Sequence, residues 1–249
     1  MKKQVRTVLK YVLVISCTAI WLLPIYWMVA TSFKPTAEIY RNIPTLFPQN
    51  PTLESYRYLF QETRFLNGVR NSLIVALTVA AFSMLIGYPA SYAIARLRFR
   101  MSRPFATILL LCYLIPSSVL YIPLYNMVNK MGLSNSLPAL MVIYPVFTLP
   151  YVAWVLTPHI QSVSRVIEEA SIIDGCTRVQ RMYRIVLPAV FPGLVSTFIF
   201  AFTLCWGEYL YALVNILSEE SKTYPLIITS LIYGDLYPWN QIMAAGTLA

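Results

Sequence analysis

The residues whose types could support chemistry are few in this chain of 249 residues. His159 is the only histidine, and the four cysteines are scattered, so the sequence predicts neither a metal site nor a His-based catalytic triad. Glycine is scarce, at eight residues, and no glycine-rich loop of the kind that cradles nucleotide phosphates is present. The remaining candidates are acidic residues, which lie in the charged segment 161–188 and, for Glu208, in an apolar run. We therefore expect no catalytic residues, and no metal or cofactor bound by this chain.

Apolar runs dominate the rest of the sequence. Hydrophobic residues make up 58% and charged residues 12% of the chain, whereas about 25% of the residues of soluble domains are charged. A spanning helix needs about 20 predominantly apolar residues, and the last run is too short to cross a bilayer, so we expect a truncated sixth span. The sequence predicts an all-α, polytopic membrane helix bundle forming a single domain over 1–249, with spans at about 11–33, 72–95, 105–127, 137–156, 189–213 and 240 to the end.

The basic residues set the expected orientation. With the N-terminus inside, the cytoplasmic segments hold twelve basic and three acidic residues, a net charge of +9, including the cluster Arg96, Arg98, Arg100 and Arg103. The outside loops hold seven basic and six acidic residues, a net charge of +1, over a longer sequence. Cytoplasmic loops are enriched in Lys and Arg, so we expect a cytoplasmic N-terminus. This topology accounts for the excess of basic over acidic residues better than nucleic-acid binding does. We therefore expect no nucleic-acid partner.

Prolines mark the expected irregularities. Pro116 and Pro123 interrupt the third run, and Pro145 and Pro150 lie inside the fourth. Neighbouring helices of a bundle can satisfy the carbonyls that such kinks release. The proline-rich polar stretch 34–70 is long enough to form an ordered extracytoplasmic loop, with a short helix near Leu53–Phe60.

The charged segment 161–188 contains a first short amphipathic helix. Apolar residues recur at helical spacing from Val166 to Ile173, and Glu168 and Glu169 fall largely on the opposite face. Such a helix either projects into the cytoplasm or lies at the membrane interface with its basic residues on lipid headgroups.

A second short helix follows in the same segment. Gly175 can end the first helix because glycine readily adopts a positive φ. Thr177 and Gln180 then have the spacing of a capping box, and Pro188 lies where the chain re-enters the membrane. We expect two short helices at an angle that project a charged knuckle into the cytoplasm.

This segment resembles the EAA loop of ABC-importer permeases. The family motif is Glu-Ala-Ala, three residues, Gly, nine residues, then Ile-x-Leu-Pro, with Ser171 here in place of the second alanine. The motif positions are filled by Glu169, Ala170, Ser171, Gly175, Ile185, Leu187 and Pro188.

The resemblance extends to the carbohydrate-importer branch, of the maltose-permease type. It is carried by Asn71-Ser72-Leu73, Ile122-Pro-Leu-Tyr125 with Gly132-Leu133, Leu149-Pro150 and Trp206-Gly-Glu-Tyr-Leu210, and it covers nearly the whole chain.

The resemblance implies a transport subunit in a bacterial or archaeal cell inner membrane. It implies that the loop 161–188 is a coupling helix that docks on a dimeric ATPase, with Glu168, Glu169, Asp174 and Gly175 among the docking residues. ATP and Mg would then bind in that partner ATPase. The other implied partners are a second permease subunit that is a different chain, an extracytoplasmic solute-binding protein, a sugar substrate and the lipid bilayer.

Glu208 is the one acidic residue inside an expected span. An ionisable residue in a membrane is a functional candidate by default, so Glu208 could line the substrate path or serve as a structural acid at the helix end. Trp206 and Tyr209 beside it could stack on sugar rings or could be interface aromatics. A rival hypothesis is an ion-gradient-driven secondary transporter, but the sequence shows no convincing internal repeat.

Overall fold

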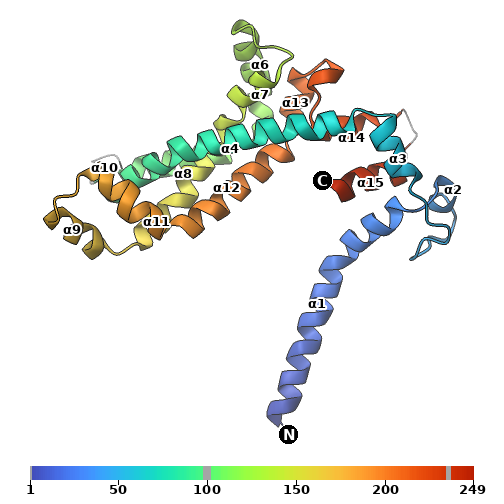
Figure 1. Cartoon of the computed structure of the whole chain (residues 1–249), viewed down its shortest axis with the longest axis horizontal. Helices are drawn as coiled ribbons and strands as arrows, with labels where there is room; N and C mark the ends of the chain where they lie inside the picture. Colours follow the sequence, from blue (N-terminus) through green and yellow to red (C-terminus); the bar gives the residue numbers. More distant parts are fainter. Residues whose placement is uncertain (1, 98–101, 234–236) are drawn as a thin grey trace. The chain divides into compact units, whose positions relative to one another are not determined.

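The computed structural model describes residues 2–97, 102–233 and 237–249 (Figure 1). Within these ranges the regular elements are all helices, which confirms the all-α class. Arg98 and Arg100 of the expected basic cluster lie outside the described residues. The chain forms two compact units, one of Met1–Leu66 with Ile227–Ala249 and the other of Asn67–Leu226.

The first unit is built on a long helix, α1 (Lys2–Ser32). Its stretch Leu9–Ser32 is long and apolar enough to cross a membrane, and its side chains from Leu9 to Ile25 contact little else in the chain. Towards its end α1 packs against α15 (Trp239–Leu248), the element that corresponds to the expected sixth span. Two shorter helices complete the unit, α2 (Thr36–Ile39) and α3 (Glu54–Gln61), of which α3 confirms the helix expected near residues 53–60.

A buried carboxylate organises the loop that follows α1. Glu38 accepts hydrogen bonds from the Thr45 hydroxyl at 2.5 Å and from the backbone N–H of Gln49 at 3.0 Å. The ammonium of Lys34 donates to the carbonyl of Thr45 at 2.5 Å. The hydrogen bond from Thr45 holds the pKa of Glu38 below its ordinary value of 4.5, against the opposing effect of burial. The polar loop is therefore ordered around a charged glutamate.

The second unit holds most of the apolar helices. They are α4 (Phe65–Arg96), α5 (Ser102–Leu114), the 3₁₀ turn η1 (Ser117–Leu120), α6 (Tyr121–Lys130), α7 (Leu137–Ile143), α8 (Pro145–Ser162), α12 (Phe191–Trp206), α13 (Leu210–Asn215) and the 3₁₀ turn η3 (Glu219–Ser221). Helix α14 (Tyr224–Ser230) begins in this unit and ends in the first. In the described residues only Leu9–Ser32 and Phe65–Arg96 meet the length and hydropathy of a span as single helices, and three bent pairs could supply up to three more.

Two of the four prolines expected to interrupt these spans lie at the breaks of bent pairs. The third span bends by 81° around Pro116, and the fourth bends by 40° at Pro145. Pro123 and Pro150 instead lie inside α6 and α8 and do not interrupt them. The fourth span, however, continues through Ser162 instead of ending near residue 156. Proline removes a backbone donor and clashes with the preceding turn, which accounts for both bends.

The run expected to form the fifth span, at about 189–213, contains two separate helices. The chain turns by 81° at Val190, and α12 ends at Trp206 before the non-helical residues Gly207–Tyr209 and a separate helix, α13. Pro192 is compatible with the start of α12 because the first turn of a helix needs no backbone donor there. The span is therefore shorter than the apolar run that encodes it.

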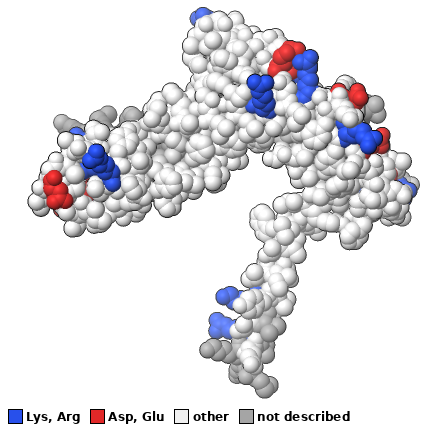
Figure 2. All heavy atoms as spheres, in the orientation of Figure 1, with Lys and Arg blue, Asp and Glu red and all other residues white. Residues whose placement is uncertain are grey.

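Two apolar clusters hold the second unit together. One joins α4, α7 and α13 around the fully buried Tyr144, and the other joins α4, α8 and α12 around Leu156 and Ile160. On the face shown in Figure 2, the middle of the surface along α4 and α12 carries almost no charge, whereas charged side chains gather near both ends of α4, at α9–α10 and near α13. This pattern fits helices in lipid with both ends in water.

The contact between α8 and α12 depends on Gly193. A Cβ atom on Gly193 would lie 2.7 Å from Cγ of the His159 ring, which is too close for a real contact. We expect Gly193→Leu to destabilise the purified chain by about 1–3 kcal/mol, because the added atoms overpack the contact. Thermal unfolding in detergent measures this, with Gly207→Leu as the matched control because a Cβ there meets nothing closer than 3.7 Å.

The double variant Gly193→Leu with His159→Ala should recover most of the lost stability, since the smaller side chain leaves room. Equal unfolding temperatures for Gly193→Leu and Gly207→Leu would contradict the close contact.

The Glu38 network predicts an acid-sensitive loop. Because the pKa of Glu38 is lower in the folded chain than its ordinary value, its stabilisation is complete above that value and is lost as pH falls through the folded pKa. We expect the protection of the Gln49 amide against hydrogen exchange, corrected for intrinsic rates, to persist at pH 5 and to fall only below 4.5. Glu38→Gln should lower this protection at neutral pH and remove the acid step, whereas Glu54→Gln should change neither. Loss of protection above pH 5 in the unaltered chain would show that the network does not hold the loop.

Candidate functional site

The charged segment folds as the helix, glycine and capped helix that the sequence predicts. Its first helix is α9 (Arg165–Ile173). Gly175, at φ +79°, donates its N–H to the carbonyl of Ile172 at 3.0 Å, and the N–H of Cys176 reaches the carbonyl of Ser171 at 2.9 Å. These two bonds form a Schellman motif, in which glycine suits the left-handed residue. The helix end is thereby fixed by residues that the EAA motif contains.

The second helix begins at a complete capping box. Thr177 donates its backbone N–H to the side-chain oxygen of Gln180 at 2.8 Å. The backbone N–H of Gln180 donates to the Thr177 hydroxyl at 3.3 Å. The chain continues through α10 (Arg178–Gln180), a π-helical stretch η2 (Arg181–Val186) and α11 (Leu187–Ala189). Pro188 lies in the first turn of α11, shortly before the bend into α12.

A buried ion pair fixes α9 to the end of α4. Glu168 pairs with the guanidinium of Arg96, and the two side chains are only 9% and 7% exposed. The Tyr92 hydroxyl donates to Glu168 at 3.2 Å, and a second nitrogen of Arg96 donates to the carbonyl of Val163 at 2.7 Å. A buried charge is tolerated when it is paired and hydrogen-bonded, and removing one partner is then strongly unfavourable. Glu168 therefore serves as an anchor within the chain.

The sequence reasoning missed Tyr92 and Arg96 as site residues. They are four positions apart and so share one face at the C-terminal end of α4. That spacing, with a basic residue at the end of an apolar run and an acidic residue in the next charged segment, is the signal that could have identified them. The arginine was counted only as part of a basic cluster.

The outward side of α9 is apolar as well as charged. Val166, Ile167 and Ile173 are 70%, 53% and 88% exposed, whereas Glu168 faces inward. The expected charged knuckle is thus incomplete, because its tip also presents isoleucine and valine to the surroundings. Glu168 turns inward, where it pairs with Arg96, whereas Glu169 stays exposed. Exposed apolar side chains on a well-ordered projection are typical of a protein-docking surface.

The other predicted coupling residues divide by exposure. Ser171 is buried, and its hydroxyl donates to the carbonyl of Glu168 at 2.7 Å. Ile185 and Leu187 are half-buried at the base of the projection. Those that remain exposed are Glu169, Ala170, Asp174, Gly175 and Pro188.

A polar cavity of about 240 Å³ adjoins the base of α9. Arg165, Arg178 and Arg181 line it together with the Arg96–Glu168 pair. The basic residues of the segment therefore cluster around one hollow at the predicted cytoplasmic end of the second unit.

Glu208 lies in a network inside the chain. Its carboxylate accepts hydrogen bonds from the Tyr144 hydroxyl at 2.9 Å and from the backbone N–H groups of Tyr211 and Ala212 at 2.9 and 3.2 Å. A carboxylate at a helix N-terminus satisfies donors that the helix cannot use itself. Glu208 therefore holds the start of α13, which matches the structural alternative for this residue.

The aromatic residues beside Glu208 pack within the chain. Trp206 stacks on Phe202, at a centroid distance of 5.6 Å, and on Tyr224, at 5.5 Å. Tyr209 is half-buried against the cluster around Tyr144.

Comparison with known proteins gives consistent matches. Residues 83–249 match the model of the family described as binding-protein-dependent transport system inner membrane component. The diacetylchitobiose uptake system permease protein DasC of Streptomyces coelicolor is 37% identical over 227 residues, covering 90% of this chain and 82% of that protein.

Solved structures share the fold. A bacterial ABC transporter involved in the import of the acidic polysaccharide alginate superposes with a TM-score of 0.77 at 18% identity, covering 100% of this chain and 92% of that one. A bacterial alginate ABC transporter in complex with an alginate pentasaccharide-bound periplasmic protein gives a TM-score of 0.64 at 20% identity, covering 99% and 90%.

The buried pair predicts opposite behaviour of two neighbouring glutamates. Glu168→Gln should destabilise the docking of α9 by about 3 kcal/mol, because it leaves Arg96 buried without a counter-charge. Glu169→Gln, at the exposed adjacent position, should change stability by no more than about 0.5 kcal/mol. Hydrogen exchange over Arg165–Ile173 in the purified chain measures both. Equal exchange in the two variants would contradict the anchoring role of Glu168.

Proposed function

The chain belongs to the family of binding-protein-dependent transport system inner membrane components, and from that premise we propose that it forms half of the translocation path of an ABC importer and couples to a separate ATPase through residues 161–188. It is a carbohydrate-type permease of this family, a multi-pass membrane protein. We place it in a bacterial or archaeal inner membrane with its N-terminus in the cytoplasm, on the strength of the charge asymmetry.

The observation that carries the coupling proposal is the outward face of α9. Apolar side chains of Ile167 and Ile173 project beside the exposed acid Glu169, on a helix whose base is locked to α4 by the Arg96–Glu168 pair. Hydrophobic contacts at the centre of such a surface can supply most of the binding free energy. The fixed base makes the projection suited to transmit movement as well as to bind.

The partners follow from this arrangement. A dimeric ATPase binds ATP and Mg²⁺ and receives the α9 projection in a cleft. A second permease supplies the other half of the path. An extracytoplasmic solute-binding protein delivers the cargo, as the periplasmic protein in the alginate transporter complex supports. Closure of the ATPase dimer on ATP pulls the projections together, and the path then opens outward, which is a two-state change biased from a distant site.

The proposed cargo is a sugar. Support comes from the permease of the diacetylchitobiose uptake system and from the alginate importers. The rival hypothesis of an ion-driven transporter needs a carboxylate free to exchange its ion. Glu208 is instead held by three donors, which favours the ATP-driven importer.

The coupling surface is testable in the assembled importer, co-expressed with its genomic neighbours. Ile173→Asp should weaken co-purification of the ATPase by about tenfold or more, because it places a charge in an apolar contact. Leu217→Asp is the matched control, since Leu217 is similarly exposed but belongs to an outside loop. Glu169→Lys should weaken co-purification of the ATPase as Ile173→Asp does, whereas Glu219→Lys, like Leu217→Asp, should leave it unchanged.

Uptake of radiolabelled maltose, trehalose, N,N′-diacetylchitobiose and alginate oligosaccharide, with the cognate binding protein present, identifies the cargo class. If Ile173→Asp and Glu169→Lys leave ATPase association and uptake unchanged in a folded complex, the coupling assignment is wrong.

A further inference from the structure

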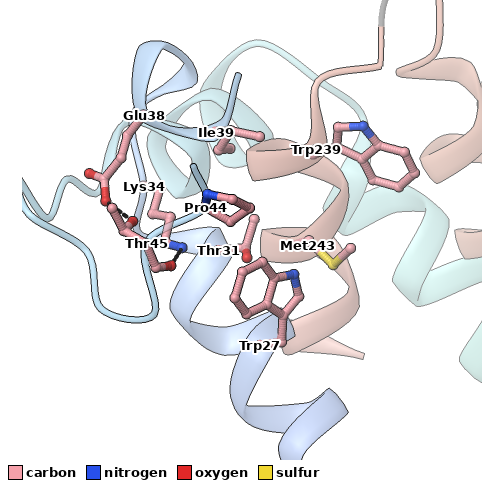
Figure 3. A pocket seen from close by; sticks show the side chains of 9 residues that line it. All are labelled: Trp27, Thr31, Lys34, Glu38, Ile39, Pro44, Thr45, Trp239 and Met243. Atoms are coloured by element: carbon pink, nitrogen blue, oxygen red, sulfur yellow. Dashed lines mark hydrogen bonds between the residues drawn. The ribbon is translucent and has the colours of Figure 1, made fainter. Parts of the chain in front are cut away.

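A second cavity lies within the first compact unit, far along the sequence from the coupling loop. It measures about 320 Å³ and is enclosed by the end of α1, the loop after it and the start of α15 (Figure 3). With the N-terminus in the cytoplasm, these three segments lie at the extracytoplasmic side of the membrane. Small-molecule sites range from about 300 to 1,000 Å³, so the cavity suits a small ligand.

The polar wall of this cavity is already fixed. Lys34 and Glu38 are almost fully buried, and Thr45 joins them by accepting from Lys34 at its carbonyl and donating to Glu38 from its hydroxyl, as Figure 3 shows. The ammonium and the carboxylate balance in charge. A ligand therefore meets a pre-formed polar surface without excess charge, which favours a neutral polar molecule.

One buried hydroxyl in the wall has no hydrogen-bond partner. Thr31 is 5% exposed and lines the cavity, and its hydroxyl makes no hydrogen bond to any described residue. Other helical threonines donate their hydroxyls to backbone carbonyls of the preceding turn. Thr18 donates to the carbonyl of Val14 at 2.9 Å, and Thr247 donates to the carbonyl of Met243 at 2.7 Å. A buried, unsatisfied hydroxyl is unfavourable, and a ligand hydroxyl in the cavity would satisfy it.

The apolar wall includes two tryptophans. Trp27 is half-buried, with the Lys34 ammonium 4.5 Å from its ring centroid on one face. Trp239, at the start of α15, stacks on Tyr237 and remains 41% exposed. Indole offers a large apolar surface next to a polar N–H, which matches the mixture of C–H faces and hydroxyls on a sugar ring.

We propose that this cavity is a saccharide-binding subsite on the extracytoplasmic side of the chain, which takes a short neutral saccharide unit between its tryptophans and the Thr31 hydroxyl. The class of ligand rests on the proposed sugar-import function. The subsite itself rests on the cavity, the unpartnered hydroxyl and the tryptophans. Its position fits it to receive one end of the cargo before the cargo enters the translocation path.

The test measures tryptophan fluorescence of the purified full chain in phosphatidylcholine nanodiscs during titration with maltose, trehalose and N,N′-diacetylchitobiose in turn. At least one disaccharide should produce a saturable change. Trp239→Leu should abolish it, and Thr31→Val should raise the apparent Kd by about tenfold, the equivalent of one lost hydrogen bond. Trp154→Leu is the matched control because Trp154 is 44% exposed in the other unit. Thr18→Val is the control on α1.

Three results would overturn the subsite. They are the absence of a saturable change with all three disaccharides, an unchanged affinity in Thr31→Val and Trp239→Leu, and a signal that a short-chain phosphatidylcholine produces while the sugars do not. The uptake assay separates this failure from that of the proposed function. If the unaltered importer takes up a disaccharide but none binds at the cavity, only the subsite proposal is wrong. If the chain associates with the ATPase but the importer takes up no sugar, the sugar assignment is wrong.

Discussion

The ion pair between Arg96 and Glu168 joins the α9 projection to the apolar helices. A nine-residue helix such as α9 is too short to be stable by itself in water, so its position must come from contacts with the rest of the chain. The pair, with the Tyr92 hydroxyl, ties α9 to the last turn of α4, a helix of 32 residues. A displacement of the tip is thereby passed to a membrane-spanning helix instead of being absorbed by a loose loop.

The same pair explains which face of α9 is free. Because Glu168 turns inward, the neighbouring isoleucines and Val166 turn outward and are exposed. Fixed helix ends complete the projection, with the Schellman motif at Gly175 and the capping box at Thr177. Glu208 is likewise held by internal contacts, around α13. Glu169 and Asp174 remain exposed for an outside partner.

Much of this architecture could be predicted from local sequence. The apolar runs, the breaks at Pro116 and Pro145, the glycine turn and the capping box all depend on residues within a few positions of one another. The Arg96–Glu168 pair could not be predicted so directly, since its partners are 72 positions apart and meet only in the folded bundle. The end of α12 at Trp206 was also missed, because hydropathy continues through the break while the Glu208 carboxylate starts a new helix there. Similarly, the unpartnered hydroxyl of Thr31 is invisible in sequence, where it resembles any other helical threonine.

Site-specific photo-crosslinking tests the central claim most directly. A benzophenone amino acid placed at Ile173 in the assembled, membrane-embedded importer samples the immediate neighbours of the α9 tip, and the same probe at Leu217 samples the outside loop. Docking of the projection on the motor subunit predicts a crosslink from position 173 to the ATPase and none from position 217. Absence of an ATPase crosslink at 173 in an importer that hydrolyses ATP and transports its cargo would contradict it.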